Sequence, residues 1–118
     1  MTEYFNRVHN GEPIDDIEII DFHAHLGPYF NMHVAWSGAD DMVRMMDLCG
    51  IDKTVLSPTP AICSDLVYGN DMMLEAIASH PGRLYGACSV NGNFPELSVD
   101  ELERTFENER VVMIKLHP

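Results

Sequence analysis

Short apolar segments alternate with amphipathic segments through most of this sequence, with about 30 residues from one apolar segment to the next. This spacing is typical of βαβ units, in which a helix returns the chain across the sheet so that consecutive strands are parallel. Strands are expected at 18–25, 54–56, 83–90 and 111–116, and the helices between them at about 40–49, within 65–80 and at 99–108. We therefore predict an α/β fold with about four parallel strands.

Residues 18–118 are expected to form the domain, and residues 1–17 a lead-in to it. The lead-in has room for a short helix before the turn signal at Asn10 and Gly11. No sequence motif repeats at the spacing of the strands, so the periodicity belongs to the fold and does not indicate a solenoid.

Capping residues and helix breakers set the expected limits of the helices. Asn70 is expected to cap the most secure part of the second helix, 71–79. The proline-rich segment 57–60 is expected to be a loop that follows the second strand. The acidic residues from Glu96 to Glu109 are expected on a solvated face of the third helix.

Composition excludes several classes of function. The chain has 118 residues, 46% hydrophobic and 22% charged, which is typical of globular proteins. Its formal net charge of -12 argues against nucleic-acid binding, because a phosphate backbone attracts basic surfaces. Three widely spaced cysteines indicate neither a disulfide framework nor a zinc knuckle. Without a secretory signal or an apolar segment of membrane-spanning length, we expect a cytoplasmic protein with no membrane partner.

The first strand carries polar side chains where a buried strand of a parallel sheet would be continuously apolar. Because successive side chains of a strand alternate between faces, Asp21, His23 and His25 are expected on one face. Two adjacent imidazoles are a common metal-binding arrangement. The alternative is a pair of structural histidines that are hydrogen-bonded in a core.

The fourth strand ends with a second polar pair, Lys115 and His117. Alternation places this pair on one face, and the apolar residues Val112, Ile114 and Leu116 on the other face, which we expect helices to cover. The carboxyl ends of parallel strands meet at one edge of a sheet, where α/β proteins place their sites. Lys115 and His117 are therefore expected to face the same hollow as the histidines of the first strand.

These residues lie within segments that resemble the metal-dependent amidohydrolase superfamily, and within it the amidohydrolase-related branch that includes aminocarboxymuconate-semialdehyde decarboxylase-like enzymes. The resemblance extends from about residue 18 to the end of the chain. It rests on segments in the family order, which are Ile20-Asp21-Phe22-His23-Ala24-His25, Gly50-Ile51-Asp52-Lys53-Thr54-Val55, His80-Pro81-Gly82-Arg83-Leu84-Tyr85-Gly86 and Met113-Ile114-Lys115-Leu116-His117-Pro118.

The resemblance implies a (β/α)8 TIM barrel in which His23 and His25 bind a divalent metal, Zn2+ or alternatively Mn2+. It also implies that Lys115 and His117 face the site and contact substrate or metal. The family's other ligands, histidines on strands five and six and an aspartate on strand eight, have no counterpart in this sequence. A complete barrel takes about 250 residues, so the sequence corresponds to the N-terminal half of one. The expected partners are a small-molecule substrate and either a missing C-terminal half or a second copy in a homo-oligomer.

The implied function is hydrolysis of a small carboxylated or cyclic substrate by metal-activated water, with His117 and Lys115 as catalytic residues. One alternative is a metal-dependent decarboxylase of the same superfamily. Another is a half-barrel fragment without catalytic competence that acts as a structural or interaction module. The two enzyme hypotheses predict that the chain binds metal through His23 and His25, whereas the interaction-module hypothesis does not.

Several individual roles stay open at the level of sequence. Lys115 fits a carboxylated metal bridge, a cation for a substrate carboxylate, or a solvated surface charge. His117 fits an acid, a base or a substrate contact, or else an ordinary loop residue. Asp21 fits either an orienting partner of the imidazoles or a cap for loop amides. The loop side chains Tyr29, Phe30, His33 and Trp36 fit either the wall of a site or packing within the loop.

Overall fold

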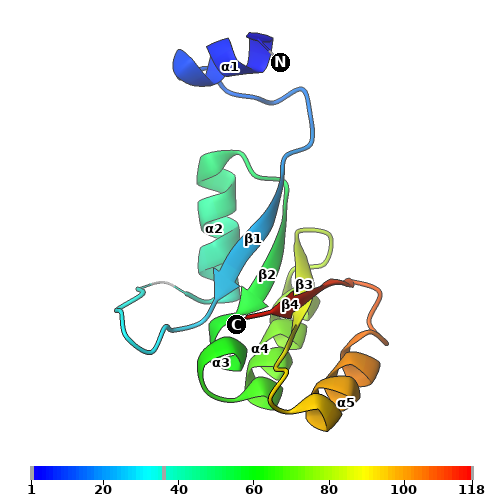
Figure 1. Ribbon diagram of the computed structural model, residues 1–118. Helices are drawn as coiled ribbons and strands as arrows, with labels where there is room; N and C mark the ends of the chain where they lie inside the picture. The colour runs from blue at the N-terminus through cyan, green and yellow to red at the C-terminus, as the bar shows by residue number, and fades with distance from the viewer. Residues whose placement is uncertain (1, 36, 118) are drawn as a thin grey trace.

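The computed structural model describes residues 2–35 and 37–117 (Figure 1). Along the chain, the elements are α1 (Thr2–His9), β1 (Ile20–Leu26), α2 (Ala39–Cys49), β2 (Lys53–Pro58), α3 (Thr59–Cys63), α4 (Leu66–Ser79), β3 (Leu84–Val90), α5 (Pro95–Thr105) and β4 (Val111–Leu116). The strands form one sheet in the order β1-β2-β3-β4, and every neighbouring pair is parallel. The predicted α/β fold with four parallel strands is confirmed.

Helices cover one face of this sheet and leave the other face open. The core on the covered face contains Ala24, Leu26, Leu56, Leu84, Cys88 and Val111 from the strands, with Met46 from α2 and Met73, Ala76 and Ile77 from α4. Burying these apolar side chains is the main favourable contribution to folding. We refer to the opposite side of the sheet as the open face. Helix α1 lies apart from the sheet at the end of an extended linker (Figure 1).

Helix α4 is the central support of the covered face, and two glycines allow its close packing. A side chain at Gly86 of β3 would overlap with Met73 of α4, so Gly86 faces the helix. A side chain at Gly69 of α4 would overlap with the backbone of Ala61 in α3. Gly69 is therefore required by space, because an added methyl group would meet backbone, whereas at Gly86 the overlap is with the side chain of Met73.

Helix α4 lies within the expected range 65–80, but the predicted N-cap, Asn70, was wrong. The helix begins at Leu66, and the N-cap is Asp65, whose carboxylate accepts a hydrogen bond from the backbone N–H of Tyr68 at 2.9 Å. Asn70 is instead fully buried within the helix. Its side-chain oxygen accepts a hydrogen bond from the Ser89 N–H at 3.0 Å, and its side-chain nitrogen donates to the Ser89 carbonyl at 3.1 Å. Asn70 thus binds both backbone groups of one β3 residue, as a neighbouring strand would.

The boundaries of two further helices differ from the sequence prediction. The proline-rich segment after β2 was expected as a loop, but Thr59 and Pro60 begin the short helix α3, since proline fits the first turn of a helix. Helix α5 runs from Pro95 to Thr105, so it begins and ends a few residues earlier than predicted. Within α5, Glu101 is only 3% exposed, which contradicts its expected place on a solvated face.

The apolar residues of β4 are not covered by helices, in contrast to the prediction. Val112, Ile114 and Leu116 are 48%, 53% and 64% exposed. The physical reason lies in the layout, because α5 contacts β3 and the helices of the described chain do not extend over the outer edge of β4. No helix within residues 2–35 and 37–117 is long and apolar enough to cross a membrane.

The packing of α4 on α3 gives a stability prediction. Replacing Gly69 with alanine should lower the free energy of unfolding by about 1–3 kcal/mol, because the added methyl group must displace the backbone of Ala61. Urea unfolding of Gly69→Ala measures this loss. Gly92→Ala is the matched control, since a methyl group there meets nothing within 4 Å. Equal stability of the two variants would contradict the packing described.

Candidate functional site

The histidine pair of β1 lies at an irregularity in the strand, with His23 inside it and His25 just after it. The pairing register of β1 with β2 shifts between Asp21 and Ala24, so β1 carries one extra residue there. The Asp21 carboxylate accepts a hydrogen bond from the backbone N–H of His23 at 2.9 Å. Asp21 therefore caps a backbone amide at this bulge, which is the simpler of its two expected roles. Strict alternation from Asp21 to His23, as assumed from the sequence, does not hold across a bulge.

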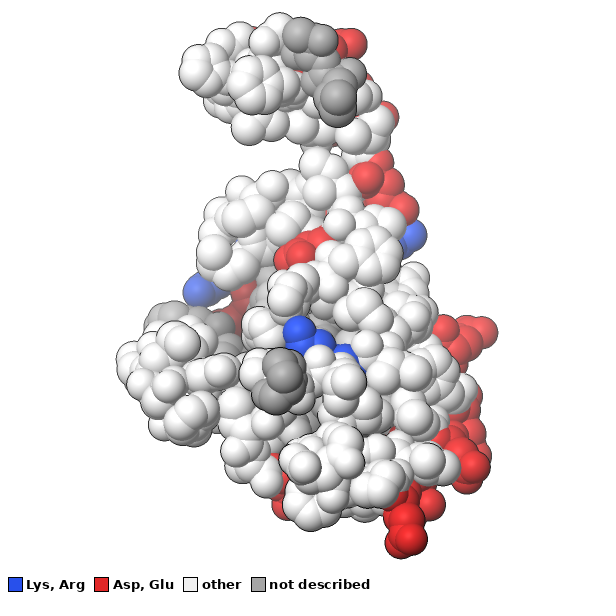
Figure 2. All heavy atoms as spheres, in the orientation of Figure 1, with Lys and Arg blue, Asp and Glu red and all other residues white. Residues whose placement is uncertain are grey.

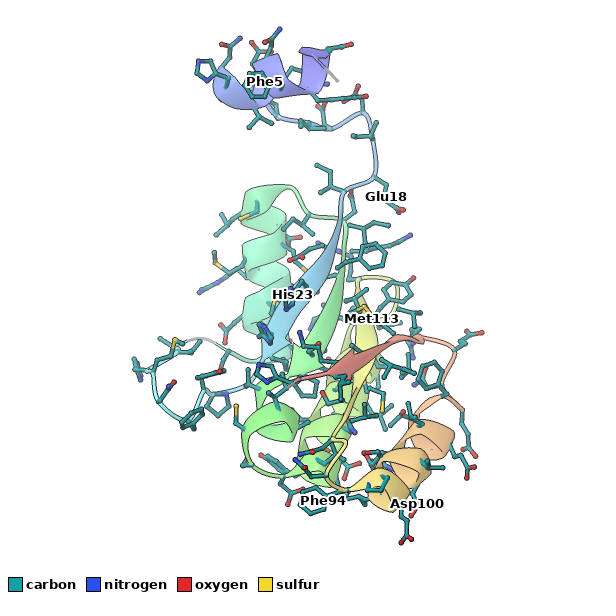
Figure 3. All side chains as sticks on the ribbon, viewed as in Figure 1. Phe5, Glu18, His23, Phe94, Asp100 and Met113 are labelled. Atoms are coloured by element: carbon teal, nitrogen blue, oxygen red, sulfur yellow. The ribbon has the colours of Figure 1, made fainter. Side chains whose placement is uncertain are left out.

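The two imidazoles lie on the open face. Ala24 and Leu26 belong to the buried core, so His25 between them extends to the opposite side, and the contacts of His23 with His25 and Lys115 place it on the same side. Their ring centroids are 5.1 Å apart, with an angle of 59° between the ring planes. Figure 3 shows His23 on the part of β1 that the end of β4 approaches.

Lys115 of β4 reaches the histidine pair from the other edge of the sheet. Its Nζ lies 3.2 Å from Nε2 of His23. Because neighbouring strands are about 4.8 Å apart, the outer strands of a flat four-stranded sheet would be separated by about 14 Å. Side chains that stand perpendicular to a flat sheet would not meet over this distance, so the contact favours a curved sheet with a concave open face. The contact is therefore evidence for barrel-like curvature as well as for the site.

The electrostatics of the cluster favour a neutral His25. Partial burial is the largest cause that lowers the pKa of His25, and the charges of His23, Lys115 and His117 lower it further. A hydrogen bond between the His25 ring and the backbone of Ser57 acts in the opposite direction. Such a bond raises the pKa of His25 when a ring N–H donates to a backbone carbonyl, because that contact stabilises the protonated ring. The other ring nitrogen then carries a lone pair that is available to a metal or a proton.

The structure thus brings the four predicted site residues to one edge of the open face. His23 and His25 come from β1, Lys115 comes from β4, and His117 follows β4 close enough to affect the pKa of His25. The loop residue His33 is exposed, and Tyr29 and Phe30 stack on each other with ring centroids 5.3 Å apart. Trp36 and Pro118 lie outside the described residues.

The donor set fits part of a metal site. Two imidazoles are suitable ligands, whereas a catalytic zinc ion takes about three protein ligands and a water molecule. Across the described part of the chain, no group of three or more His, Cys, Asp or Glu side chains is placed to hold a metal ion. A protonated lysine offers hydrogen-bond donors and no lone pair, so Lys115 in that form does not complete the set.

Sequence reasoning missed two serines in the same region. Ser57 of β2 is paired in register with His25, and Ser89 of β3 is paired with Lys115. Both are almost fully buried, at 1% and 2% exposed. The sequence could have indicated them, because both serines lie at the carboxyl ends of the two central strands, where α/β folds place their sites.

Comparisons with known proteins identify the fold. A solved structure of a probable 2-pyrone-4,6-dicarboxylic acid hydrolase from Acinetobacter baumannii, with citric acid bound, is similar to this chain with a TM-score of 0.51 and 24% sequence identity. The similarity covers 83% of this chain and 37% of that chain, so this chain spans well under half of the matched structure. It corresponds to a fragment of a TIM-barrel fold. No family model and no curated protein matches the sequence.

The environment of His25 predicts a pH dependence. The pKa of His25 should lie below the ordinary value of 6.5, as measured by NMR titration of the ring nitrogens. Since the unfolded chain then binds the proton more readily than the folded chain, stability should fall as the pH falls through 6.5 towards the lowered pKa.

Urea unfolding at about pH 7.5 and about pH 5.5 measures this change. His25→Gln should reduce the difference between the two pH values, whereas His33→Gln in the exposed loop should leave it unchanged. Titration of His25 at or above its ordinary pKa would contradict the described environment.

Proposed function

We propose that this chain is the N-terminal part of a metal-dependent hydrolase of the amidohydrolase type that acts on a small carboxylated or cyclic substrate. His23 and His25 are two of its metal ligands, and Lys115 and His117 are its catalytic residues. The single observation that carries the proposal is the 3.2 Å approach of Lys115 Nζ to His23 Nε2, because it joins the carboxyl ends of β1 and β4 in one site. Sites of parallel α/β folds lie at this edge.

The state of the imidazoles supports their role as ligands. Metal binding requires neutral imidazole, and the lowered pKa of His25 favours that form at neutral pH. A ligating histidine usually donates its second N–H to a carbonyl or carboxylate, and the backbone of Ser57, which affects the pKa of His25, is the candidate acceptor for its ring. Zn2+ suits imidazole ligands best among common catalytic metals, and Mn2+ is the alternative.

Each side chain has a chemical task in the proposal. A bound divalent ion would supply a Lewis acid that makes water nucleophilic near neutral pH. The ammonium group of Lys115 binds a substrate carboxylate, because a lysine is a compact cation with several N–H donors. His117 transfers a proton to or from the substrate, since imidazole is the side chain whose ordinary pKa lies near neutrality.

The remaining metal ligands are assigned to polypeptide outside the described residues. The chain aligns with 37% of a hydrolase structure, which leaves room for a C-terminal half or for a second copy of this chain. That neighbour is a probable hydrolase of a dicarboxylic acid, which favours hydrolysis of a carboxylated substrate over decarboxylation. No described residue specifically favours a decarboxylase.

A Zn2+ titration followed by NMR of the histidine side chains tests the metal site in this chain alone. The ring nitrogens of His23 and His25 should shift at the lowest zinc concentrations, because paired imidazoles bind more tightly than single ones. The rings of His9 and His33, which are exposed and lie outside the pair, should shift only at higher concentrations.

His23→Ala and His25→Ala should each weaken zinc binding by at least about tenfold, because a single imidazole remains. His33→Ala is the matched control and should retain the binding of the unmodified chain. Equal zinc response of all exposed histidines, or no loss in either variant of the pair, would reject the metal-dependent enzyme and leave the interaction module as the explanation.

A further inference from the structure

The two central strands place small hydroxyl side chains beneath the site. Ser57 of β2 and Ser89 of β3 are 1% and 2% exposed. Among the residues that the structure describes, neither hydroxyl oxygen has a hydrogen-bond partner. Buried polar atoms in native proteins are nearly always paired, so two such atoms in one region require an explanation.

Both hydroxyls face the open side of the sheet. Gly86 faces Met73 of helix α4, and Ser89 is three residues further along the regular strand, so its side chain extends to the opposite face. Leu56 belongs to the helix-covered core, so its neighbour Ser57 also extends to the open face. The two serines therefore share the face of the histidine pair and Lys115.

The position of Ser89 is held from the covered side. Asn70 binds both the N–H and the C=O of Ser89, at 3.0 and 3.1 Å. Asn70 also donates to Glu101 at 2.9 Å, and Glu101 is in turn bound by Arg104. This network satisfies the backbone of Ser89 and leaves its hydroxyl available to a group on the open face.

The cover over the two hydroxyls is adjustable. Ser57 is paired in register with His25, and Ser89 with Lys115. The contact between Lys115 and His23 joins the outer strands, so it spans the central strands that carry the serines. Lysine is a flexible side chain on a four-carbon stem, so it can move and admit a ligand without a change in the backbone.

We propose that Lys115, Ser57 and Ser89 form a subsite for one carboxylate group of the ligand. The ammonium of Lys115 and the two hydroxyls are donors, and a carboxylate has two oxygens that accept several hydrogen bonds. The assignment of this carboxylate to a substrate rests on the proposed function. A carboxylate provides the partners that the buried hydroxyls lack in the described chain.

The charge distribution agrees with a local anion site in an acidic protein. The net charge of -12 repels anions on average, so a carboxylate needs a specific cation. Figure 2 shows Lys or Arg atoms in the middle of the open face, whereas the largest area of Asp and Glu follows the edge where α5 lies. On the face in view, the largest acidic area thus lies at the α5 edge, away from the proposed subsite, and a smaller group of Asp or Glu atoms lies on the same face as the subsite.

A malonate titration of the 118-residue chain, which is first freed of metal with EDTA and then desalted to remove the chelator, tests the proposal. Backbone amide shifts of residues around Ser57, Ser89 and Lys115 should change and saturate. Ser57→Ala and Ser89→Ala should each raise the Kd for malonate by about tenfold, because each removes a hydrogen bond to a charged group. Lys115→Met should raise it by at least that much, since it removes the cation.

Urea unfolding separates binding from folding in these variants. Ser57→Ala and Ser89→Ala should unfold at the same or a higher urea concentration, because removing a buried hydroxyl without a partner does not break a hydrogen bond. Thr105→Val is the matched control, since it removes a buried hydroxyl beside Cys88 on the covered face and should leave the Kd for malonate unchanged.

Three outcomes of the malonate titration would overturn the subsite proposal. No saturable malonate shift, unchanged affinity in both serine variants, or an equal loss in Thr105→Val would show that water or repacking satisfies the two hydroxyls. The zinc titration keeps the two proposals apart. Malonate binding without a zinc response from His23 and His25 would retain the subsite and reject the metal, and the reverse result would retain the metal and reject the subsite.

Discussion

The curvature of the sheet is the constraint on which the candidate site depends most directly, and the contact between Lys115 and His23 is its clearest sign. These side chains come from the two outer strands of the sheet, and their terminal nitrogens lie 3.2 Å apart. Such an approach favours a curved sheet, because strands separated by two others would be about 14 Å apart in a flat one and side chains stand roughly perpendicular to a sheet. Curvature also turns the open face into a hollow, so polar groups from separate strands converge at its rim.

The curved sheet is in turn supported from the opposite side by α4. Met73 of this helix packs against Gly86, and Gly69 allows the helix to approach Ala61. The carboxamide of Asn70 then holds both backbone groups of Ser89 near the end of β3. A single helix thus supplies apolar contacts to the middle of the sheet and hydrogen bonds to the strand end that borders the site. Helix α4 thus links the packing of the sheet to the proposed site.

Several errors of sequence interpretation have one physical origin. Asn70 was expected as a helix cap and Glu101 as a solvated acid, because both residue types usually occupy such positions. In the structure they are 0% and 3% exposed and bonded to each other, which only the packing of α4 against α5 makes favourable. The exposed apolar residues of β4 show the converse. Alternation correctly places Ile114 on the side away from Lys115. It carries no information on whether a helix covers that side, and Ile114 is in fact exposed.

The sequence by itself determined the class of fold and the residues from which a site could be built. Apolar periodicity specified parallel strands with helices between them, and alternation near the strand ends selected His23, His25 and Lys115, because both patterns depend only on local backbone geometry. Only the tertiary structure decided that these side chains meet. It also decided that Ser57 and Ser89 lie buried beneath them, since curvature, the bulge in β1 and the position of α4 arise from contacts between residues distant in the chain.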